Sequence, residues 1–447
     1  MEPAAEEPRL PLGDFLQDRV YGLRQQPQST LSRLQISPHL RQNHMHRDIG
    51  ALACLRDKRI VLISHDLAQA GSQLLLVETA VRLRDAGAHV HLATLAEDTR
   101  PGNLAARNNI AIFPVAESFR QCASADLVIA NTAVAAGWVN SYLREYAVGA
   151  RSLVWWIHEI DACSYADQMN SLGLVAMALF DSHASLRSWA DAGLTFPPLT
   201  QVIHPGVDGA FVEKSTKSRF SYPGDGLLRR FGLTPRLHTR TKIRTILGIA
   251  PEDFAIILVG HFLERKGQSL LMGTVSRLLS QYPQLPLKVI MVGFKSEKNK
   301  TAFLNQLNDA GRRALDDRRA VTIVHDLTPY YAASDAFVMN SQGLGENFGR
   351  VTIEAMTFKL PVLGTDAGGT PEIVEHGVTG LLHPVGIEGQ EKLAHNIVML
   401  MKNRDVAKTM GDAGSRRVKE KFTAMRFDAE FASLLQIILN AQRSGRS

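Results

Sequence analysis

The sequence has few cysteines and no long apolar run. Its three cysteines, Cys54, Cys122 and Cys163, are too few and too far apart for a disulfide framework or a CxxC metal site. The longest uninterrupted apolar runs, such as 173–180, fall well short of the roughly 20 residues that a membrane span needs. We therefore expect no transmembrane segment and a reducing compartment, with the cytosol fitting best.

Motifs of several enzyme classes are also missing. There is no HExxH, no GxxxxGK[ST] and no Gly-x-Ser-x-Gly, so metalloproteases, P-loop NTPases and α/β-hydrolases are disfavoured. The acidic start, MEPAAEEPRL, has neither the basic and apolar regions of a secretory signal nor the composition of a transit peptide. We therefore expect a cytoplasmic location.

The positive charge does not form one stripe. A net charge of +6 would suit nucleic acid, an anionic membrane surface or phosphorylated substrates. The charge concentrates instead in Arg219–Arg244, which also carries Pro and Gly. We interpret this segment as a solvated linker or insertion and expect no nucleic-acid partner.

With 447 residues the chain is too long for one compact core. Short runs rich in apolar, often β-branched residues alternate with helical patterns in both halves. This alternation predicts two α/β domains, each with a doubly wound parallel sheet. Strands are expected at 59–64, 89–93, 125–130, 152–157, 174–181, 199–203, 254–259, 287–292, 321–324, 336–339 and 361–365, and helices at 74–86, 269–282, 348–358 and through most of 388–440.

The same patterns divide the chain into five parts. We expect an irregular arm over 1–57, a first domain over 58–208, the basic linker over 209–245, a second domain over 246–425 and a C-terminal helix over 426–447. Ligands of open α/β sheets bind beyond the carboxyl ends of the strands, so these ends are the places to look for a site.

Two glutamates frame the start of the helix expected at 348–358. Glu346 lies in the preceding loop and Glu354 two turns into the helix, roughly 12 Å apart along the axis. This is about the reach from a sugar ring across a pyrophosphate to a ribose. Ionised carboxylates accept hydrogen bonds from hydroxyls, and Gly349 with the helix N-terminus suits a phosphate. The spacing alone also fits a capping glutamate and a second one on a solvated face.

With its surroundings, this segment resembles the family-4 retaining glycosyltransferases. Their donor-domain signature is a glutamate, seven residues and a second glutamate, here ENFGRVTIE. It continues as KLPVLGTDAGGTPEIVEHGVTGLLHP, where Gly368, Gly369 and Glu372 match a Gly-Gly-x-x-Glu turn. Within the family, the blocks are most similar to a plant branch of the UDP-glycosyltransferase superfamily. The resemblance runs from about residue 59 to the C-terminus and implies the GT-B fold, two Rossmann-like domains facing across a cleft.

By this resemblance Glu346 contacts donor-sugar hydroxyls and Glu354 the ribose. Lys266, in VGHFLERKG, matches the lysine that holds the donor pyrophosphate. Phe348 and Gly349 lie between the two glutamates and are implied to border the donor.

One position departs from the family pattern. His261 stands where the family usually has Arg, and a histidine cannot reproduce the permanent, forked phosphate contact of a guanidinium. Either Arg265 or Arg350 compensates, or the chain binds its donor more weakly.

The first domain contributes WWIHE at 155–159. His158 matches the family histidine at the cleft, which is expected to hydrogen-bond near the donor sugar. In the loop 64–73, Gly71 and Ser72 replace the family's pair of glycines, so a phosphate-facing turn and a plain strand–helix turn fit equally well. We expect DSHAS (181–185) and HPGVD (204–208) to be mainly architectural.

No Asp-x-Asp occurs, which disfavours the other common glycosyltransferase fold, where such carboxylates hold a metal. The resemblance therefore implies a metal-independent hexosyl- or other glycosyltransferase that retains configuration, with a UDP-linked sugar as the default donor. No cofactor is expected besides this substrate, and the acceptor (glycan, lipid or small molecule) is not indicated. A non-catalytic nucleotide-sugar-binding protein and a nucleotide-sugar epimerase or hydrolase on the same fold are the alternatives.

Overall fold

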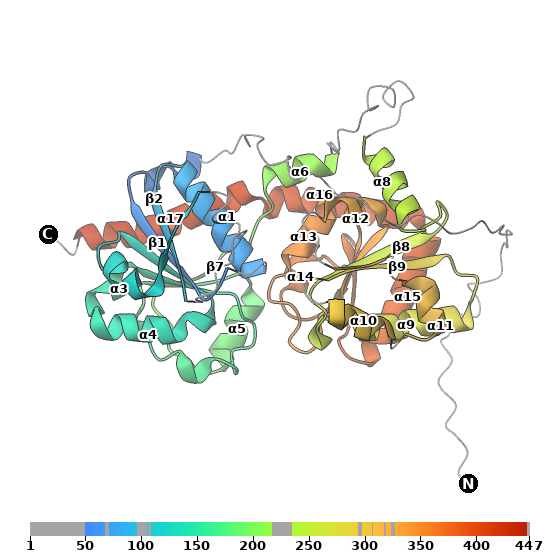
Figure 1. Ribbon diagram of the computed structural model, residues 1–447, viewed down its shortest axis with the longest axis horizontal. Coiled ribbons are helices and arrows are strands. Elements are labelled where there is room, and N and C mark those ends of the chain that lie inside the picture. Colours follow the sequence, from blue (N-terminus) through green and yellow to red (C-terminus); the bar gives the residue numbers. More distant parts are fainter. Residues whose placement is uncertain are drawn as a thin grey trace, which may run out of the picture. The chain divides into compact units, whose positions relative to one another are not determined.

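The computed structural model describes residues 50–67, 71–95, 105, 109–216, 235–293, 297–305, 307–316, 319–322 and 327–444. The chain divides into Met1–His46, which lies outside the described residues, and Arg47–Ser447. Arg47–Ser447 contains two parallel sheets, and each sheet carries helices on both faces (Figure 1).

The first sheet has seven parallel strands in the order β3-β2-β1-β4-β5-β6-β7. Its central strands are continuous apolar runs, such as LVWWI in β5, and are buried along their whole length, as expected for strands covered on both faces. The elements of this half are η2 (Gly50–Leu55), β1 (Arg59–Ser64), α1 (Gly71–Asp85), β2 (His89–Thr94), β3 (Ala111–Pro114), α3 (Val115–Ala123), β4 (Leu127–Asn131), η3 (Ala133–Ala135), α4 (Ala136–Glu145), η4 (Ala147–Ser152), β5 (Leu153–Ile157), η5 (Ala166–Gln168), η6 (Leu172–Leu174), β6 (Met177–Phe180), α5 (His183–Asp191) and β7 (Thr200–Val202).

The second sheet has six parallel strands in the order β10-β9-β8-β11-β12-β13. One face packs on α12, α13 and α16, and α15 contacts β12 and β13. The remaining elements are α6 (Gly209–Thr216), α8 (Pro235–Ile246), β8 (Phe254–Val259), η7 (Glu264–Lys266), α9 (Gln268–Gln281), β9 (Leu287–Gly293), α10 (Glu297–Asn305), α11 (Asp309–Ala314), β10 (Ala320–Thr322), α12 (Thr328–Ala333), β11 (Ala336–Met339), α13 (Arg350–Thr357), β12 (Val362–Thr365), α14 (Thr370–Ile373), β13 (Gly380–His383), α15 (Glu388–Lys402), α16 (Arg404–Lys421) and α17 (Ala424–Ser444).

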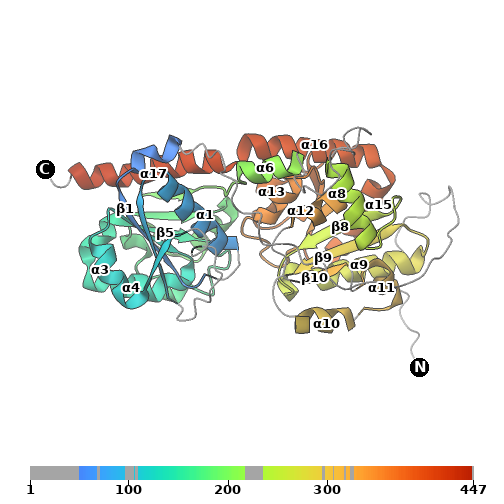
Figure 2. The same cartoon turned by 45° about the horizontal axis from the view of Figure 1, so that its top comes forward.

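The last helix, α17, packs on the first sheet although it follows the second one in the chain (Figures 1 and 2). Trp156 of β5 stacks on Phe427, with ring centroids 5.6 Å apart, and also contacts Phe431. Leu52 and Leu55 of η2 belong to the same buried cluster. The C-terminal helix therefore completes the core of the first half.

A buried ion pair fixes α17 at this position. Arg82 Nε of α1 lies 2.8 Å from Asp428 Oδ1, and the two side chains are 6% and 3% exposed. Arg82 also donates to the Thr79 hydroxyl. Two charges buried this far from water are tolerated because each satisfies the other.

The fold class predicted from the alternation of strands and helices is confirmed: both sheets are parallel, and their chain order reverses beside β1 and beside β8. Edge strands β3 and β13 had no counterpart among the expected strands. Strand β6 is shorter than expected, because residues 172–174 form the 3-10 turn η6.

The basic segment Arg219–Arg244 differs in part from the solvated linker that its charge suggested. Its residues 219–234 lie outside the described residues, but α8 packs on α12. Arg240 and Arg244 both pair with Asp335. Because Arg244 also donates to three backbone carbonyls, this part of the segment serves as a structural anchor.

Among the described helices, none has the length and apolar character needed to cross a bilayer.

Replacing Asp428 by Ala should lower the free energy of unfolding of the first half by about 3–5 kcal/mol, because Arg82 would keep a buried charge without its partner. All four tryptophans lie in this half, so tryptophan fluorescence during urea denaturation follows its unfolding. Glu430→Ala on the same helix is the control: Glu430 pairs with Arg426 at the surface, and its loss should cost no more than about 1 kcal/mol. Equal effects of both substitutions would contradict the assignment.

Candidate functional site

The polar residues of interest follow the carboxyl ends of the parallel strands. In the second half, Asn340 and Ser341 follow β11, and Lys266 lies in η7 after β8. Strands β8 and β11 are neighbours at the position where the chain order of the sheet reverses. This is where open α/β sheets bind ligands.

Lys266 and Glu346 form an ion pair at this position. The Lys266 Nζ contacts Glu346 Oε2, and the two side chains are 15% and 16% exposed. Ser341 Oγ donates to the same carboxylate at 2.8 Å. Burial alone would raise the pKa of Glu346, but the Lys266 charge and the two hydrogen bonds outweigh it and hold that pKa below its usual range. The carboxylate is therefore ionised and accepts hydrogen bonds.

The backbone of the Glu346 loop lies directly against the turn after β12. Glu346 and Gly368 form a parallel bridge, and the N–H of Gly369 donates to the Glu346 carbonyl at 2.8 Å. A Cβ on Gly368, where φ is +62°, would lie 2.2 Å from that carbonyl oxygen. The close approach therefore requires glycine at position 368. It also fixes the backbone position from which the Glu346 side chain extends.

Lys266 is also positioned through contacts of Asn340 with the next residue, Gly267. The side chain of Asn340 donates to the Gly267 carbonyl at 2.8 Å and contacts His383 Nε2 at 3.1 Å. Gly267 has φ +68° and its Cβ would lie 2.1 Å from the Asn340 carbonyl oxygen. His383 is buried, and burial lowers its pKa to about 4. Gly267 is thus held by Asn340, which in turn contacts the buried, neutral His383.

Helix α13 begins at Arg350, and its N-cap residue, Gly349, has a φ of +90° and ends the loop. Its Glu354 accepts a hydrogen bond from the buried Tyr331 hydroxyl at 3.2 Å. Burial, with the charge of Glu354 adding to it, holds the pKa of Tyr331 well above its usual range, so Tyr331 remains a donor. Arg350, at the first turn, pairs with Glu78 of α1 at 2.7 Å.

In the first half, His158 is held by two side chains from neighbouring strand ends. Its Nδ1 lies 2.6 Å from Asp181 Oδ2 and its Nε2 2.8 Å from Asn131 Oδ1. These three residues stand at the carboxyl ends of β5, β6 and β4. The His158 side chain is 5% exposed, so its ring orientation is fixed by these contacts.

Asn347 joins the loop of the second half to this cluster. Its Nδ2 donates to the His158 carbonyl at 2.8 Å, and its Oδ1 accepts from the Ser182 hydroxyl at 2.9 Å. Because Asn347 is the neighbour of Glu346, one loop positions a carboxylate and contacts the strand end that carries His158.

The loop after β1 is held by a polar chain. Ser72 Oγ donates to the Gln73 side chain, which in turn donates to Asp66 Oδ1 at 2.7 Å and contacts His65. Gly71 opens α1, and its Cβ would meet no atom within 4 Å. The structure describes 64–67 and 71–73 of this loop, and both proposed roles of Gly71 and Ser72 stay predictions.

The remaining predicted site residues differ in how far they are exposed. His261 follows β8 and is half-buried, and its carbonyl accepts from Gln268. Arg265 is exposed beside Lys266. The ring of Phe348 is 2% exposed and packs between His204 and Phe422, because the apolar core of the second half extends under the loop. That Phe348 borders the donor stays a prediction.

Several residues of this arrangement were not singled out from the sequence as site residues. They are three polar residues at buried strand ends, one loop neighbour of Glu346 and one buried tyrosine of α12: Asn131, Asp181, Ser341, Asn347 and Tyr331. The sequence does offer a signal for Asn131, Asp181 and Ser341, because each lies at the end of a buried apolar run. Tyr331 and Asn347 give no such signal, since their roles depend on contacts distant in sequence.

Chemically, the second half offers an ammonium, a carboxylate and a helix N-terminus in one place, with a second carboxylate on the same helix. Such a set can hold a ligand with both phosphates and hydroxyls.

Comparisons with known families match both halves of the chain. Residues 56–215 match the family described as glycosyl-transferase family 4, and residues 239–417 match glycosyl transferases group 1. The chain belongs to the family-4-like glycosyltransferases.

Related proteins of known name are distant from this family-4-like chain. N-acetyl-alpha-D-glucosaminyl L-malate synthase of Bacillus anthracis is 24% identical over 207 residues, which cover 46% of this chain and 51% of that protein. D-inositol 3-phosphate glycosyltransferase of Geodermatophilus obscurus is 32% identical over 201 residues, 44% of this chain and 38% of the relative. The chain thus spans about half or less of the length of these curated relatives.

Solved structures share the fold. HepE of Anabaena, determined in complex with UDP-glucose, has a TM-score of 0.68 at 22% identity and covers 85% of this chain and 99% of its own. WaaG, a glycosyltransferase involved in lipopolysaccharide biosynthesis, has a TM-score of 0.62 at 14% identity, covering 84% and 99%. These neighbours establish the GT-B fold of the chain.

Gly368→Ala should lower the free energy of unfolding more than Gly377→Ala does. Both positions need a positive φ, but only a Cβ at Gly368 collides with backbone, whereas a Cβ at Gly377 meets nothing within 4 Å. The collision should add about 1–3 kcal/mol to the strain that the two variants share. Denaturant unfolding measures both, and equal losses would mean that the Glu346 loop does not depend on this contact.

His383 should make stability depend on pH. Its folded pKa of about 4 lies below its ordinary value of 6.5, so between these values the unfolded chain binds the extra proton. Stability is full above pH 6.5 and falls as the pH decreases, by about 2 kcal/mol between roughly pH 7.5 and pH 5. In His383→Gln this part of the slope should be absent, whereas the exposed His395→Gln should keep it. The same slope in both variants would contradict the assignment to His383.

Proposed function

We propose that the chain transfers a sugar from a UDP-linked donor to an acceptor hydroxyl with retention of configuration and without a metal ion. The observation that carries this proposal is the Lys266–Glu346 pair at the start of α13. It combines a phosphate-binding cation with a hydroxyl-binding carboxylate at the switch point of the second sheet.

Each group of the pair has capacity left for a donor. The Lys266 ammonium has three N–H bonds, of which Glu346 takes one, so the others can reach a diphosphate. The ionised Glu346 has a second oxygen for sugar hydroxyls. Backbone N–H groups at the first turn of α13, beyond Gly349, add partial positive charge for the phosphates. This set can stabilise the leaving diphosphate electrostatically as the glycosidic bond breaks.

Glu354 lies on the same helix and is oriented by the Tyr331 hydroxyl. We assign it to the ribose hydroxyls of the donor. The choice of UDP rests on HepE, whose solved structures contain UDP and UDP-glucose, and on the resemblance of the signature.

His158 is assigned to the sugar side of the reaction. Its contacts with Asp181 and Asn131 orient the ring. In the proposed transfer the acceptor oxygen attacks from the face of the leaving group. The bond to the anomeric carbon forms as the bond to the diphosphate breaks, and the acceptor proton passes to the departing phosphate.

We also propose a reducing compartment, on the basis of the cysteines. Cys54, Cys122 and Cys163 are free thiols, and burial raises the pKa of Cys122 to about 12. A reducing compartment such as the cytosol suits three unpaired thiols.

Lys266→Ala and Glu346→Ala should each reduce transfer at least about tenfold. Calorimetry with UDP-sugars, in buffer containing EDTA, gives the donor affinity, and release of UDP during turnover gives the rate. Donor binding should survive EDTA and should weaken in Lys266→Ala and Glu354→Ala. Glu264→Ala, an exposed residue in the same 3-10 turn as Lys266, should leave both quantities unchanged.

His158→Ala separates an enzyme from a binding protein. We expect donor affinity to change by less than about threefold while UDP release falls at least about tenfold. UDP-sugar binding by the wild type with no turnover in extracts that supply acceptors would instead favour a non-catalytic nucleotide-sugar-binding protein. Unchanged transfer in both Lys266→Ala and Glu346→Ala would refute the site.

A further inference from the structure

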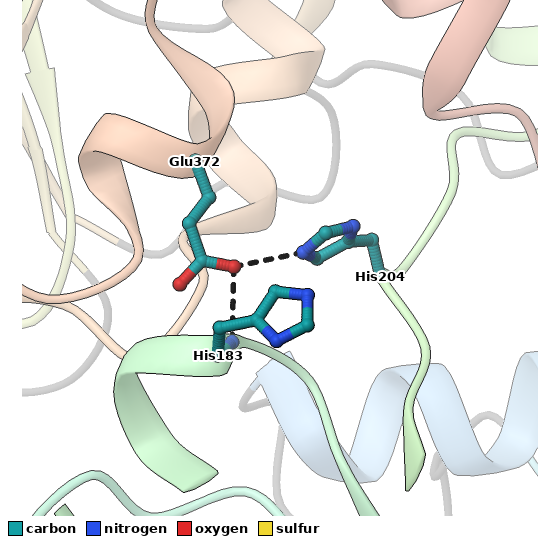
Figure 3. A group of neighbouring side chains, drawn as sticks. All are labelled: His183, His204 and Glu372. Atoms are coloured by element: carbon teal, nitrogen blue, oxygen red, sulfur yellow. Dashed lines mark hydrogen bonds and ion pairs between the residues drawn. The ribbon is translucent and has the colours of Figure 1, made fainter. Parts of the chain in front are cut away.

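Three potential metal ligands converge outside the Lys266–Glu346 site. They are His183 at the start of α5, His204 just after β7 and Glu372 in α14 (Figure 3). One ligand atom from each lies within 4.8 Å of the other two. The two imidazole rings meet edge to face with centroids 5.8 Å apart. Two imidazoles and a carboxylate have thus been brought together from segments far apart in sequence.

Glu372 is held in place by groups other than the histidine rings. Its Oε1 accepts the N–H of Ala184 at 2.8 Å, and its Oε2 accepts the N–H of His183 at 3.0 Å. His204 Nε2 lies 2.9 Å from the same Oε2. These hydrogen bonds fix the direction of the carboxylate, as the outer-shell partners of a metal ligand do.

We propose that His183, His204 and Glu372 bind a divalent transition-metal ion of the Zn²⁺ type. Two imidazoles and one carboxylate form a common zinc ligand set, which leaves the fourth tetrahedral position for water. With bonds of about 2.0–2.2 Å, the ligand atoms of such a site lie about 3.3 Å apart. The exposed His183 ring has to move inward by roughly an ångström or more to reach this spacing.

Metal binding has to replace one hydrogen bond. His204 Nε2 and Glu372 Oε2 contact each other at 2.9 Å, and both atoms can ligate the ion only when no proton lies between them. The backbone donors to Glu372 remain, and they orient the carboxylate as outer-shell partners do.

The ion would connect the two halves next to the Glu346 loop. Ser182, which precedes His183, donates to Asn347, and Gly369, three residues before Glu372, donates to the carbonyl of Glu346. A metal at this position would therefore hold α5 against the turn on which the loop rests. The site takes no part in the chemistry proposed for Lys266 and Glu346, and its test does not depend on that function.

The test is a Zn²⁺ titration of the full chain under reducing conditions, in competition with a chromophoric chelator. The wild type should take up one equivalent more tightly than His183→Ala does, by at least about tenfold. His183→Ala is the decisive variant: it keeps the backbone N–H that holds Glu372, and its ring is exposed, so the fold should be preserved. His204→Ala should weaken binding similarly.

His395→Ala is the matched control, because His395 is an exposed histidine of α15 outside the cluster. It should bind Zn²⁺ as the wild type does. Co²⁺ gives a second readout: the visible absorption of a tetrahedral site should appear in the wild type and in His395→Ala but not in His183→Ala. Equal Zn²⁺ affinity in His183→Ala and the wild type, or no uptake by the wild type, would overturn the proposal and leave the cluster as a hydrogen-bonded contact.

Discussion

The candidate site depends on one close backbone approach, that of the Glu346 loop to the Gly368–Gly369 turn. A peptide group can lie this near another only where one of the two residues has no Cβ, and the Gly369 N–H then binds the Glu346 carbonyl. The approach fixes Glu346 beside Lys266. It also fixes the next residue, Asn347, whose side chain reaches the first half. The positions of the carboxylate and of the contact between the halves thus follow from a single glycine.

A second constraint comes from the polarity of parallel sheets. All thirteen named strands run parallel within their two sheets, so every strand of a sheet ends at the same edge. Each polar residue that directly follows a buried strand is therefore placed at that edge without a contact of its own. His158, Asp181 and Asn131 meet for this reason, and the hydrogen bonds between them select the ring orientation. The strand order brings the residues together, and the side-chain contacts then fix their geometry.

The sequence was sufficient for most strands of the two sheets, because buried parallel strands appear in it as apolar runs. It also singled out Lys266 and Glu346 through a contiguous signature, and their roles stay predictions. It was not sufficient for the packing of α17, since an amphipathic helix does not specify which sheet covers its apolar face. Nor did it identify Asn347 as the link to His158, a contact across 189 positions of the chain. The interpretation of Arg244 as part of a solvated linker was wrong for the same reason. The sequence does not show that its partner, Asp335, lies beside it.

Polar contacts from the segments around Glu346 join the second half to the first. Asn347 binds the His158 carbonyl, Arg350 binds Glu78 and Glu372 binds the N-terminus of α5, and all three come from the loop, the helix and the turn that surround Glu346. Polar contacts at a partly exposed boundary cost little to break, because water replaces them. An apolar boundary of similar extent would resist opening. The segments around Glu346 are therefore joined to the first half by contacts that water can replace.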